Sequence, residues 1–111
     1  MNDLLPSNNP EVDDLTMKLY IELQKRYNDM AHGTRSEIKV NKMMSNIVSN
    51  CCLWPADKTG RWVGYVQCLL IEVENVTSVK SERNFTRPYF HKLYDLIGRD
   101  IPPSIDIYEN D

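Results

Sequence analysis

Hydrophobic residues recur along the first third of the chain with the three- and four-residue spacing of an amphipathic α-helix. Polar and charged residues fall largely between them. This spacing predicts a first helix that buries one face. Asn9 can cap its start, Pro10 suits the first helical position, and Gly33 suits the position just beyond its end. The apolar positions are Val12, Leu15, Leu19, Leu23, Tyr27 and Met30.

A second amphipathic pattern follows almost at once. Thr34-Arg-Ser-Glu37 fits a capping box, in which the Thr34 hydroxyl accepts from the Glu37 amide and the Glu37 carboxylate accepts from the Thr34 amide. The helix should end near Leu53, because Pro55 disfavours helical geometry in the residue before it. The short connection predicts that the first two helices form an antiparallel αα-hairpin.

The most apolar stretch, Arg61–Glu74, lies near the middle of the chain. It lacks the period-two alternation of a strand and is long for one, so we interpret it as a helix. A helix that is apolar nearly all round is typical of the middle of a bundle, and we expect this one to be central. Asp57 or Thr59 would cap its start. Its apolar residues are Trp62, Val63, Tyr65, Val66, Cys68, Leu69, Leu70, Ile71 and Val73.

Gly64 stands inside this predicted helix, where glycine costs about 1 kcal/mol relative to alanine. Two explanations remain open: the close approach of another helix, which we favour, or the close approach of a ligand. The other three glycines, Gly33, Gly60 and Gly98, are expected at helix ends.

The remaining sequence predicts one or two more helices. Thr77 or Ser78 would start a short helix that runs to about Phe85. Pro88 has no amide hydrogen to donate to Asn84, so a separate last helix is expected to start near Thr86 and to end at Gly98. The chain is therefore predicted to be a single all-α domain, residues 1–111, with four to five helices. Residues 1–8 are expected to be a flexible lead, and residues 99–111 an extended tail that lies on its own domain or on a neighbour.

Composition places the chain among soluble globular proteins, with 41% hydrophobic and 26% charged residues. No apolar run approaches the length of a membrane span, and the first residues do not resemble a secretory signal. The three cysteines, Cys51, Cys52 and Cys68, are odd in number and include an adjacent pair, which is a poor disulfide framework. We therefore expect a cytoplasmic protein with no membrane partner, no cofactor and no metal site.

Charge is unevenly distributed along the chain, so an anionic partner remains possible in spite of the net negative charge. Residues 15–105 hold all 13 bases but only 9 of the 16 acids, whereas both ends of the chain are acidic. The basic residues Lys58, Arg61, Arg83 and Arg87, together with His91, surround two predicted helix starts, and helix starts attract anions. They are the candidate ligand site, and scattered surface charge is the alternative. Arg87, His91 and Asp95 share one helix face at spacings of four, but no nucleophile accompanies them, so we assign no catalytic residue.

Two further surfaces are candidates for binding. Arg35, Lys39 and Lys42 form a basic stripe on the second predicted helix, which could follow a nucleic-acid backbone, although no aromatic residue lies among them in the sequence. Large aromatic residues are enriched in protein interfaces, and the chain has two tryptophans and six tyrosines. We expect a homodimer or higher oligomer and assign the interface to Trp54, Trp62, Tyr89 and Tyr108.

Two segments, Arg61-Trp-Val-Gly-Tyr-Val-Gln and Ser81-Glu-Arg-Asn-Phe-Thr-Arg-Pro-Tyr-Phe-His91, resemble a pattern in small uncharacterised accessory proteins of tailed phages and prophages. The resemblance implies an accessory protein that acts on a host or phage component, and it carries no activity or functional residue with it. Three functions follow in order of preference. The first is a non-catalytic binding or inhibitor protein. The second is a nucleotide or other anionic-ligand binder, or a hydrolase, that uses Arg61, Arg83, Arg87 and His91. The third is a nucleic-acid binder that uses the basic stripe.

Overall fold

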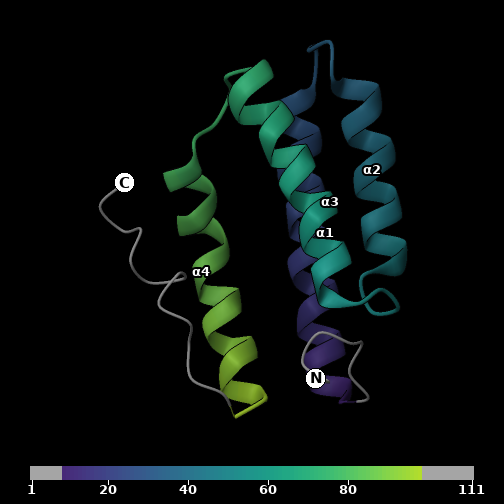
Figure 1. The fold of residues 1–111 in the computed structure, drawn as a ribbon, viewed down its shortest axis with the longest axis vertical. Coiled ribbons are helices and arrows are strands. Elements are labelled where there is room, and N and C mark those ends of the chain that lie inside the picture. The colour runs from purple at the N-terminus through teal and green to yellow at the C-terminus, as the bar shows by residue number, and fades with distance from the viewer. Residues whose placement is uncertain (1–8, 99–111) are drawn as a thin grey trace.

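The computed structural model describes residues 9–98, which form an all-α bundle (Figure 1). The predicted fold class is confirmed. The predicted lead, residues 1–8, and the predicted tail, residues 99–111, lie outside the described residues. The helices are α1 (Pro10–Ala31), α2 (Glu37–Asn50), α3 (Ala56–Cys68) with its π-helical continuation η2 (Leu69–Val73), and α4 (Val79–Leu96).

The N-terminal αα-hairpin is as predicted, but its connection is stabilised differently. Asn9 caps α1 by accepting a 2.9 Å hydrogen bond from the Glu11 amide, and Gly33 takes the left-handed conformation, with φ of 80°, after α1 ends. The predicted capping box is wrong. Glu37 is the first residue of α2 and its carboxylate accepts from the Gly33 amide at 3.1 Å, whereas the Thr34 hydroxyl accepts from the Ser36 amide at 3.2 Å. The connection forms its own turn, so α2 starts later than the capping box requires.

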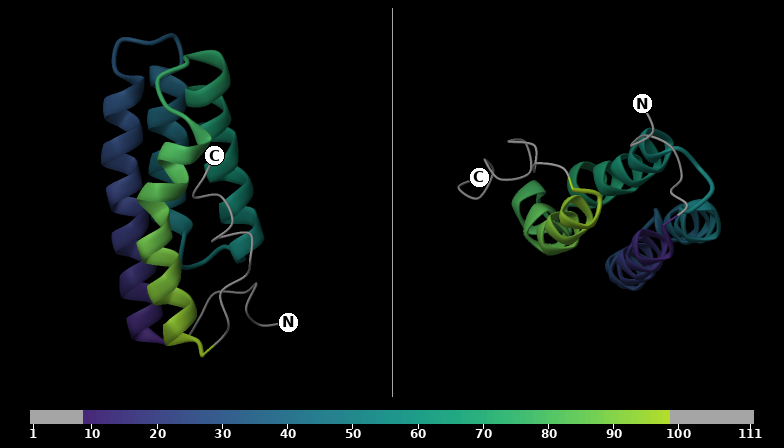
Figure 2. Two further views of the ribbon diagram at one scale, coloured as in Figure 1. Left: turned by 90° about the vertical axis from the view of Figure 1, so that its left-hand side faces the viewer. Right: turned by 90° about the horizontal axis from the view of Figure 1, so that it is seen from below.

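The helix at the centre of the bundle is α1, and the prediction that Arg61–Glu74 would be central is wrong. α1 packs against α2, α4 and η2, and Leu19, Leu23 and Tyr27 on it are fully or almost fully buried. Figure 2 shows α4 running beside α1. α3 instead lies to one side, with Tyr65 and Cys68 exposed. α1 is also the longest helix, with 22 residues against 13 in α3, and α3 packs mainly against α2 and its own continuation η2. The core is completed by Val40, Met44 and Ile47 of α2 and by Val63, Val66 and Leu70.

α3 starts earlier than expected and widens at its end. It begins at Ala56 after Pro55, without a side-chain cap, so neither Asp57 nor Thr59 is the cap. Gly60 consequently lies inside the helix and not at its end. At η2 each backbone hydrogen bond joins residues five apart along the chain and not four, as where the Glu74 amide donates to the Leu69 carbonyl at 2.9 Å. The chain then leaves the helix through Asn75, whose φ is 54°.

α4 is one continuous helix, so the predicted break at Thr86–Pro88 is wrong. Ser78 starts the helix as predicted, its hydroxyl accepting from the Ser81 amide at 3.1 Å. Pro88 and Asn84 both lie on the exposed face of α4. Water can therefore hydrate the Asn84 carbonyl that Pro88 leaves without an amide donor, while the opposite face remains packed against α1.

Candidate functional site: a groove between α3 and α4

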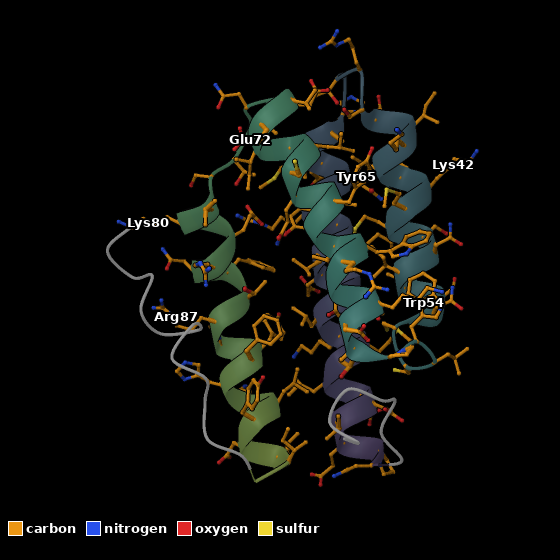
Figure 3. All side chains as sticks on the ribbon, viewed as in Figure 1. Lys42, Trp54, Tyr65, Glu72, Lys80 and Arg87 are labelled. Carbon is orange, nitrogen blue, oxygen red and sulfur yellow. The ribbon has the colours of Figure 1, made fainter. Side chains whose placement is uncertain are left out.

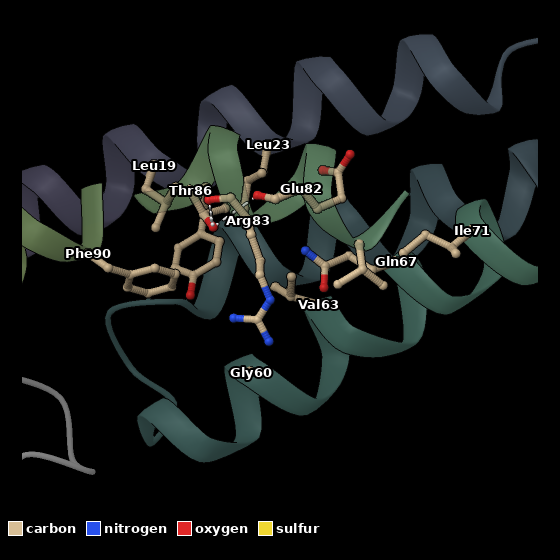
Figure 4. Close-up of a pocket in the computed structure, with 12 residues that line it drawn as sticks. Leu19, Leu23, Gly60, Val63, Gln67, Ile71, Glu82, Arg83, Thr86 and Phe90 are labelled. Carbon is tan, nitrogen blue, oxygen red and sulfur yellow. Dashed lines mark hydrogen bonds between the residues drawn. The ribbon is translucent and has the colours of Figure 1, made fainter. Parts of the chain in front are cut away.

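α3 and α4 leave a groove between them, because α4 packs mainly against α1 and α3 packs mainly against α2. The groove encloses about 300 Å³ (Figure 4). Its floor is α1, and α3 with η2 and α4 form its two walls. The lining residues are Leu19, Tyr20 and Leu23 from α1, Gly60, Val63, Gln67 and Ile71 from α3 and η2, and Val79, Glu82, Arg83, Thr86 and Phe90 from α4.

An ion pair between Arg26 of α1 and Glu82 of α4 lies beside this groove. Arg26 donates from Nε to Oε1 of Glu82 at 3.1 Å and from Nη2 to Oε2 at 3.0 Å. The guanidinium also donates to the Ser81 hydroxyl at 3.0 Å and lies 4.6 Å from the centre of the Phe85 ring. Glu82 and Thr86 are the two buried residues of α4. The most deeply buried side chain of this helix is therefore a carboxylate, beside the apolar contacts of Phe85, Tyr89, Phe90 and Leu93 with the core.

The Glu82 carboxylate also accepts a hydrogen bond from the Thr77 hydroxyl, and the nearby Tyr27 hydroxyl helps to stabilise its charge. Burial raises the pKa of Glu82, but the hydrogen bonds from Arg26, Thr77 and Tyr27 outweigh that effect and lower the pKa below its usual range. Burial strongly raises the pKa of Tyr27, so its hydroxyl keeps its proton. That hydroxyl in turn accepts from Nε2 of Gln67 at 2.8 Å. Hydrogen bonds made by neighbouring residues of α1, Arg26 and Tyr27, thus reach both α4 and α3 beneath the groove.

The α3 wall carries two glycines one turn apart. Gly60 lines the groove, and Gly64 follows four residues later on the same side of the helix. A Cβ atom built on either residue would meet nothing within 4 Å. Within the described residues, close packing therefore does not explain Gly64, although packing was the favoured interpretation. Together the two residues cost about 2 kcal/mol of helix stability relative to alanine, and leave a backbone surface open to approach.

The predicted anion-binding residues do not share one surface. Arg83 lines the groove, and Arg87 and His91 follow it along α4. Arg61 instead forms a 2.8 Å ion pair with Asp57 on the outer side of α3. Lys58 lies 4.5 Å above the Trp54 ring, and it is about 200° round the helix from Gly60, so it points away from the groove.

Lys80 was missed by the sequence analysis and joins Arg83, Arg87 and His91 at spacings of three and four along α4. We refer to these four residues as the α4 basic strip. Figure 3 shows Lys80 and Arg87 pointing away from α1, in the same direction. The spacing itself was visible in the sequence, but the expected break at Pro88 hid the fact that one helix carries all four residues.

Three of the predicted interface aromatics contribute to the packing of the chain itself. The rings of Trp54 and Trp62 are tilted against each other, with centroids 4.8 Å apart, and both pack against the core. Tyr89 also packs against the core and lies 6.1 Å from the Phe85 ring. Tyr108 lies outside the described residues. The predicted interface thus stays a prediction, and intrachain packing accounts for part of these three aromatic surfaces.

The basic stripe of α2 gains an aromatic neighbour that the sequence concealed. Nζ of Lys39 is 3.3 Å from the Tyr65 hydroxyl and 5.6 Å from the centre of that ring. Tyr65 is half exposed and belongs to α3, so only folding brings it beside Lys39. The basic stripe has no aromatic residue next to it in the sequence, which counted against a nucleic-acid surface, but it has one in the folded structure.

Among residues 9–98, no three or more His, Cys, Asp or Glu side chains are grouped so as to hold a metal ion. No helix in this part of the chain is long and apolar enough to cross a membrane. Comparison with known proteins adds no assignment: no family model matches the chain, and neither does any curated protein or solved structure.

Proposed function

We propose that this protein is a non-catalytic binding protein whose groove between α3 and α4 receives a segment of a partner protein. The observation that carries the proposal is the unfilled space between two helices that α1 and α2 already support. In a closed four-helix bundle, neighbouring helices bury their apolar faces against one another. Here Val79 remains 48% exposed while lining the groove. A helix or an extended segment laid between α3 and α4 would cover this surface.

The chemistry of the groove indicates what kind of segment fits. Ile71, Val79 and Phe90 present apolar surface to an occupant. Arg83 stands on the α4 wall and belongs to the basic strip that continues along this helix. A fitting segment therefore has apolar residues for the groove and a carboxylate for Arg83. The open backbone at Gly60 and Gly64 allows the main chain of that segment to approach α3 closely.

The same geometry favours binding over catalysis. The carboxylate in the groove wall, Glu82, is held by Arg26, Thr77 and Tyr27, and its lowered pKa leaves it a weak base. Hydrogen bonds of this kind fix the walls of the groove and do not deliver a proton to a bound molecule. The predicted context of a small cytoplasmic accessory protein of a phage or prophage is compatible with a binding or inhibitor role and remains part of the proposal.

The proposal is tested by comparing what the protein captures from a host lysate with what two variants capture. In Gly60→Leu plus Gly64→Leu, side chains block the α3 wall of the groove. In the control, Ile38→Ser, an apolar side chain that is 76% exposed on α2 is removed away from the groove. We expect a protein that wild type and the control both retain and that the groove variant loses, with all three chains equally helical by circular dichroism. Equal capture by all three would overturn the proposal.

A small anionic ligand is the second candidate, because Arg83 lines a cavity of about 300 Å³, close to the lower end of the range for small-molecule sites. A thermal-shift screen with nucleotides and cyclic dinucleotides tests it. A rise in Tm that Arg83→Ala abolishes and Arg61→Ala preserves is the expected result for this candidate. No rise with any compound would count against it.

Nucleic acid is the third candidate, supported by the contact of Lys39 with Tyr65. It requires salt-sensitive retention on heparin that Lys39→Ala plus Lys42→Ala abolishes. The predicted homo-oligomer is tested separately by light scattering, in which a species of 13 kDa at every concentration would exclude it.

A further inference from the structure

We infer that residues 99–111 of the same chain dock in the groove between α3 and α4 and compete there with the partner. This inference rests on the proposed function and names a regulator of the same site. The docked segment would be a tethered substitute for the partner, so that the groove binds another protein only when the segment is displaced.

The composition of the segment matches what the groove and the α4 basic strip require. It carries four carboxylates against one base, Arg99, and it carries four large apolar side chains. The carboxylates belong to Asp100, Asp106, Glu109 and Asp111, and the apolar side chains to Ile101, Ile105, Ile107 and Tyr108. In the groove wall, Arg83 is the basic residue, because Arg26 already neutralises the buried Glu82, and Lys80 and Arg87 continue the α4 basic strip outside the groove. The segment therefore offers carboxylates that suit Arg83 and apolar side chains that suit the groove.

The connection at the end of α4 gives the segment the reach that docking needs. Gly98 follows the helix with φ of 70°, the left-handed conformation that turns a chain away from the axis of the helix it ends. The 18 residues of α4 span about 27 Å. An extended segment of about ten residues covers roughly 33 Å, so the tail can run back along the whole of α4. Pro102 and Pro103 favour such an extended backbone.

Because residues 99–111 are attached to the domain, weak contacts are sufficient for them to occupy the groove. A segment attached by a short linker acts at an effective concentration on the order of millimolar, so a tail with a dissociation constant in that range would be docked about half of the time. A partner with higher affinity displaces it without any change in the fold of residues 9–98. The competition also suppresses binding of segments that match the groove no better than the tail does.

The inference can be tested on the full chain by NMR, because the amides of Gly60 and Gly64 are well-separated reporters on the α3 wall. In the test variant, Ile105→Ser plus Ile107→Ser, the tail loses two apolar contacts. In the matched control, Leu4→Ser plus Leu5→Ser, the same change is made in the other terminal segment. We expect the two glycine amides to shift in the test variant alone and the shift to be independent of protein concentration. Unchanged amides would overturn the inference. Concentration-dependent shifts with a dimer mass would also overturn it, because the tail would then occupy the groove of a second copy.

A synthetic peptide of residues 99–111 supplies the second readout. We expect it to bind the Ile105→Ser plus Ile107→Ser chain several-fold more tightly than wild type, whose own tail already occupies the groove. Equal affinity for both chains would contradict the inference. Failure here is distinguishable from failure of the proposed function. If the groove variant loses the partner but the tail variant leaves the glycine amides unchanged, only the inference about residues 99–111 fails. If the tail docks but capture of the partner does not depend on the groove, the proposed function fails.

Discussion

The guanidinium of Arg26 holds the carboxylate of Glu82 through two hydrogen bonds, of 3.1 and 3.0 Å, and thereby joins α1 to α4 across 56 residues of sequence. Glu82 is only 3% exposed. Since the remaining contacts of α4 with the core come from half-buried side chains such as Phe85, Tyr89 and Leu93, this pair sets the position of the α4 wall of the groove.

Removing Arg26 should consequently destabilise the protein. We expect Arg26→Leu to lower the free energy of unfolding by about 2–3 kcal/mol, somewhat less than for a fully buried pair, because it leaves the buried Glu82 charge without its partner. Urea denaturation measures this loss. Lys25→Ala is the matched control, because the neighbouring Lys25–Glu22 pair is exposed and should contribute less than about 0.5 kcal/mol. The double variant Arg26→Leu plus Glu82→Leu should lose less than Arg26→Leu alone, and a larger loss would contradict this assignment.

The lowered pKa of Glu82 predicts a specific loss of stability in acid. A carboxylate whose pKa is lower in the folded than in the unfolded state stabilises the fold above its unfolded pKa, about 4.3. That contribution disappears as the pH falls through the folded pKa. Unfolding free energies of wild type and Glu82→Gln, measured from pH 7 to pH 3, should therefore differ most near neutral pH and converge in acid. A difference that stays constant over this range would show that ionisation of Glu82 does not stabilise the fold.

The two glycines of the α3 wall should be replaceable with a gain in stability. Because a Cβ at Gly60 or Gly64 meets nothing within 4 Å, each change to alanine should raise the free energy of unfolding by up to about 1 kcal/mol. Gly33→Ala is the contrasting variant, since φ of 80° at Gly33 strains any residue with a side chain, and it should destabilise. Thermal unfolding of the three variants checks both signs. Destabilisation by Gly64→Ala would mean that another element already packs against that position.

Thiol reactivity should follow the burial of the three cysteines. Cys68 is exposed, whereas Cys51 is buried and its pKa is raised to about 12, first by burial and then by the neighbouring Cys52. Burial also raises the pKa of Cys52. A thiol reagent at neutral pH should modify one cysteine rapidly in the native protein and all three after unfolding. Cys68→Ser should remove the fast phase, and its persistence in that variant would contradict the described burial.

The sequence predicted the helical fold and several helix ends, but not every helix boundary and not the arrangement of the helices. Local signals such as Asn9, Gly33 and Ser78 placed helix ends correctly, because capping depends on neighbours along the chain. Pro88 misled, because a proline is tolerated inside a helix when the carbonyl that it leaves without an amide donor, here that of Asn84, is exposed to water. The apolar stretch Arg61–Glu74 also misled, because the apolar content of a helix does not specify which helix packs against the largest number of others.

The groove itself depends on contacts that sequence spacing cannot reveal. Three helices supply the residues beside the groove: Arg26 and Tyr27, Gln67, and Glu82. The partners in their hydrogen bonds between helices are at least 40 residues apart in the sequence. One signal was available: Glu82 lies on the same helix face as Thr86, Tyr89 and Leu93, and a charge on a mainly apolar face calls for a buried partner. Arg83 could be nominated from its charge alone, and it lines the groove, but its role in binding stays a prediction. Lys80 was not found, because the predicted break concealed the continuous strip.

The most direct test of the groove as the partner-binding site is photo-cross-linking in cells from two positions of the full chain. A photoreactive residue replaces Val79, which lines the groove, or Ile38, which is on α2 and is more exposed, at 76% against 48%. Non-specific contact would favour Ile38, so the account predicts a discrete adduct from position 79 that Gly60→Leu plus Gly64→Leu abolishes, and none from position 38. Adducts from position 38 alone, or an adduct from position 79 that survives the blocked groove, would contradict it.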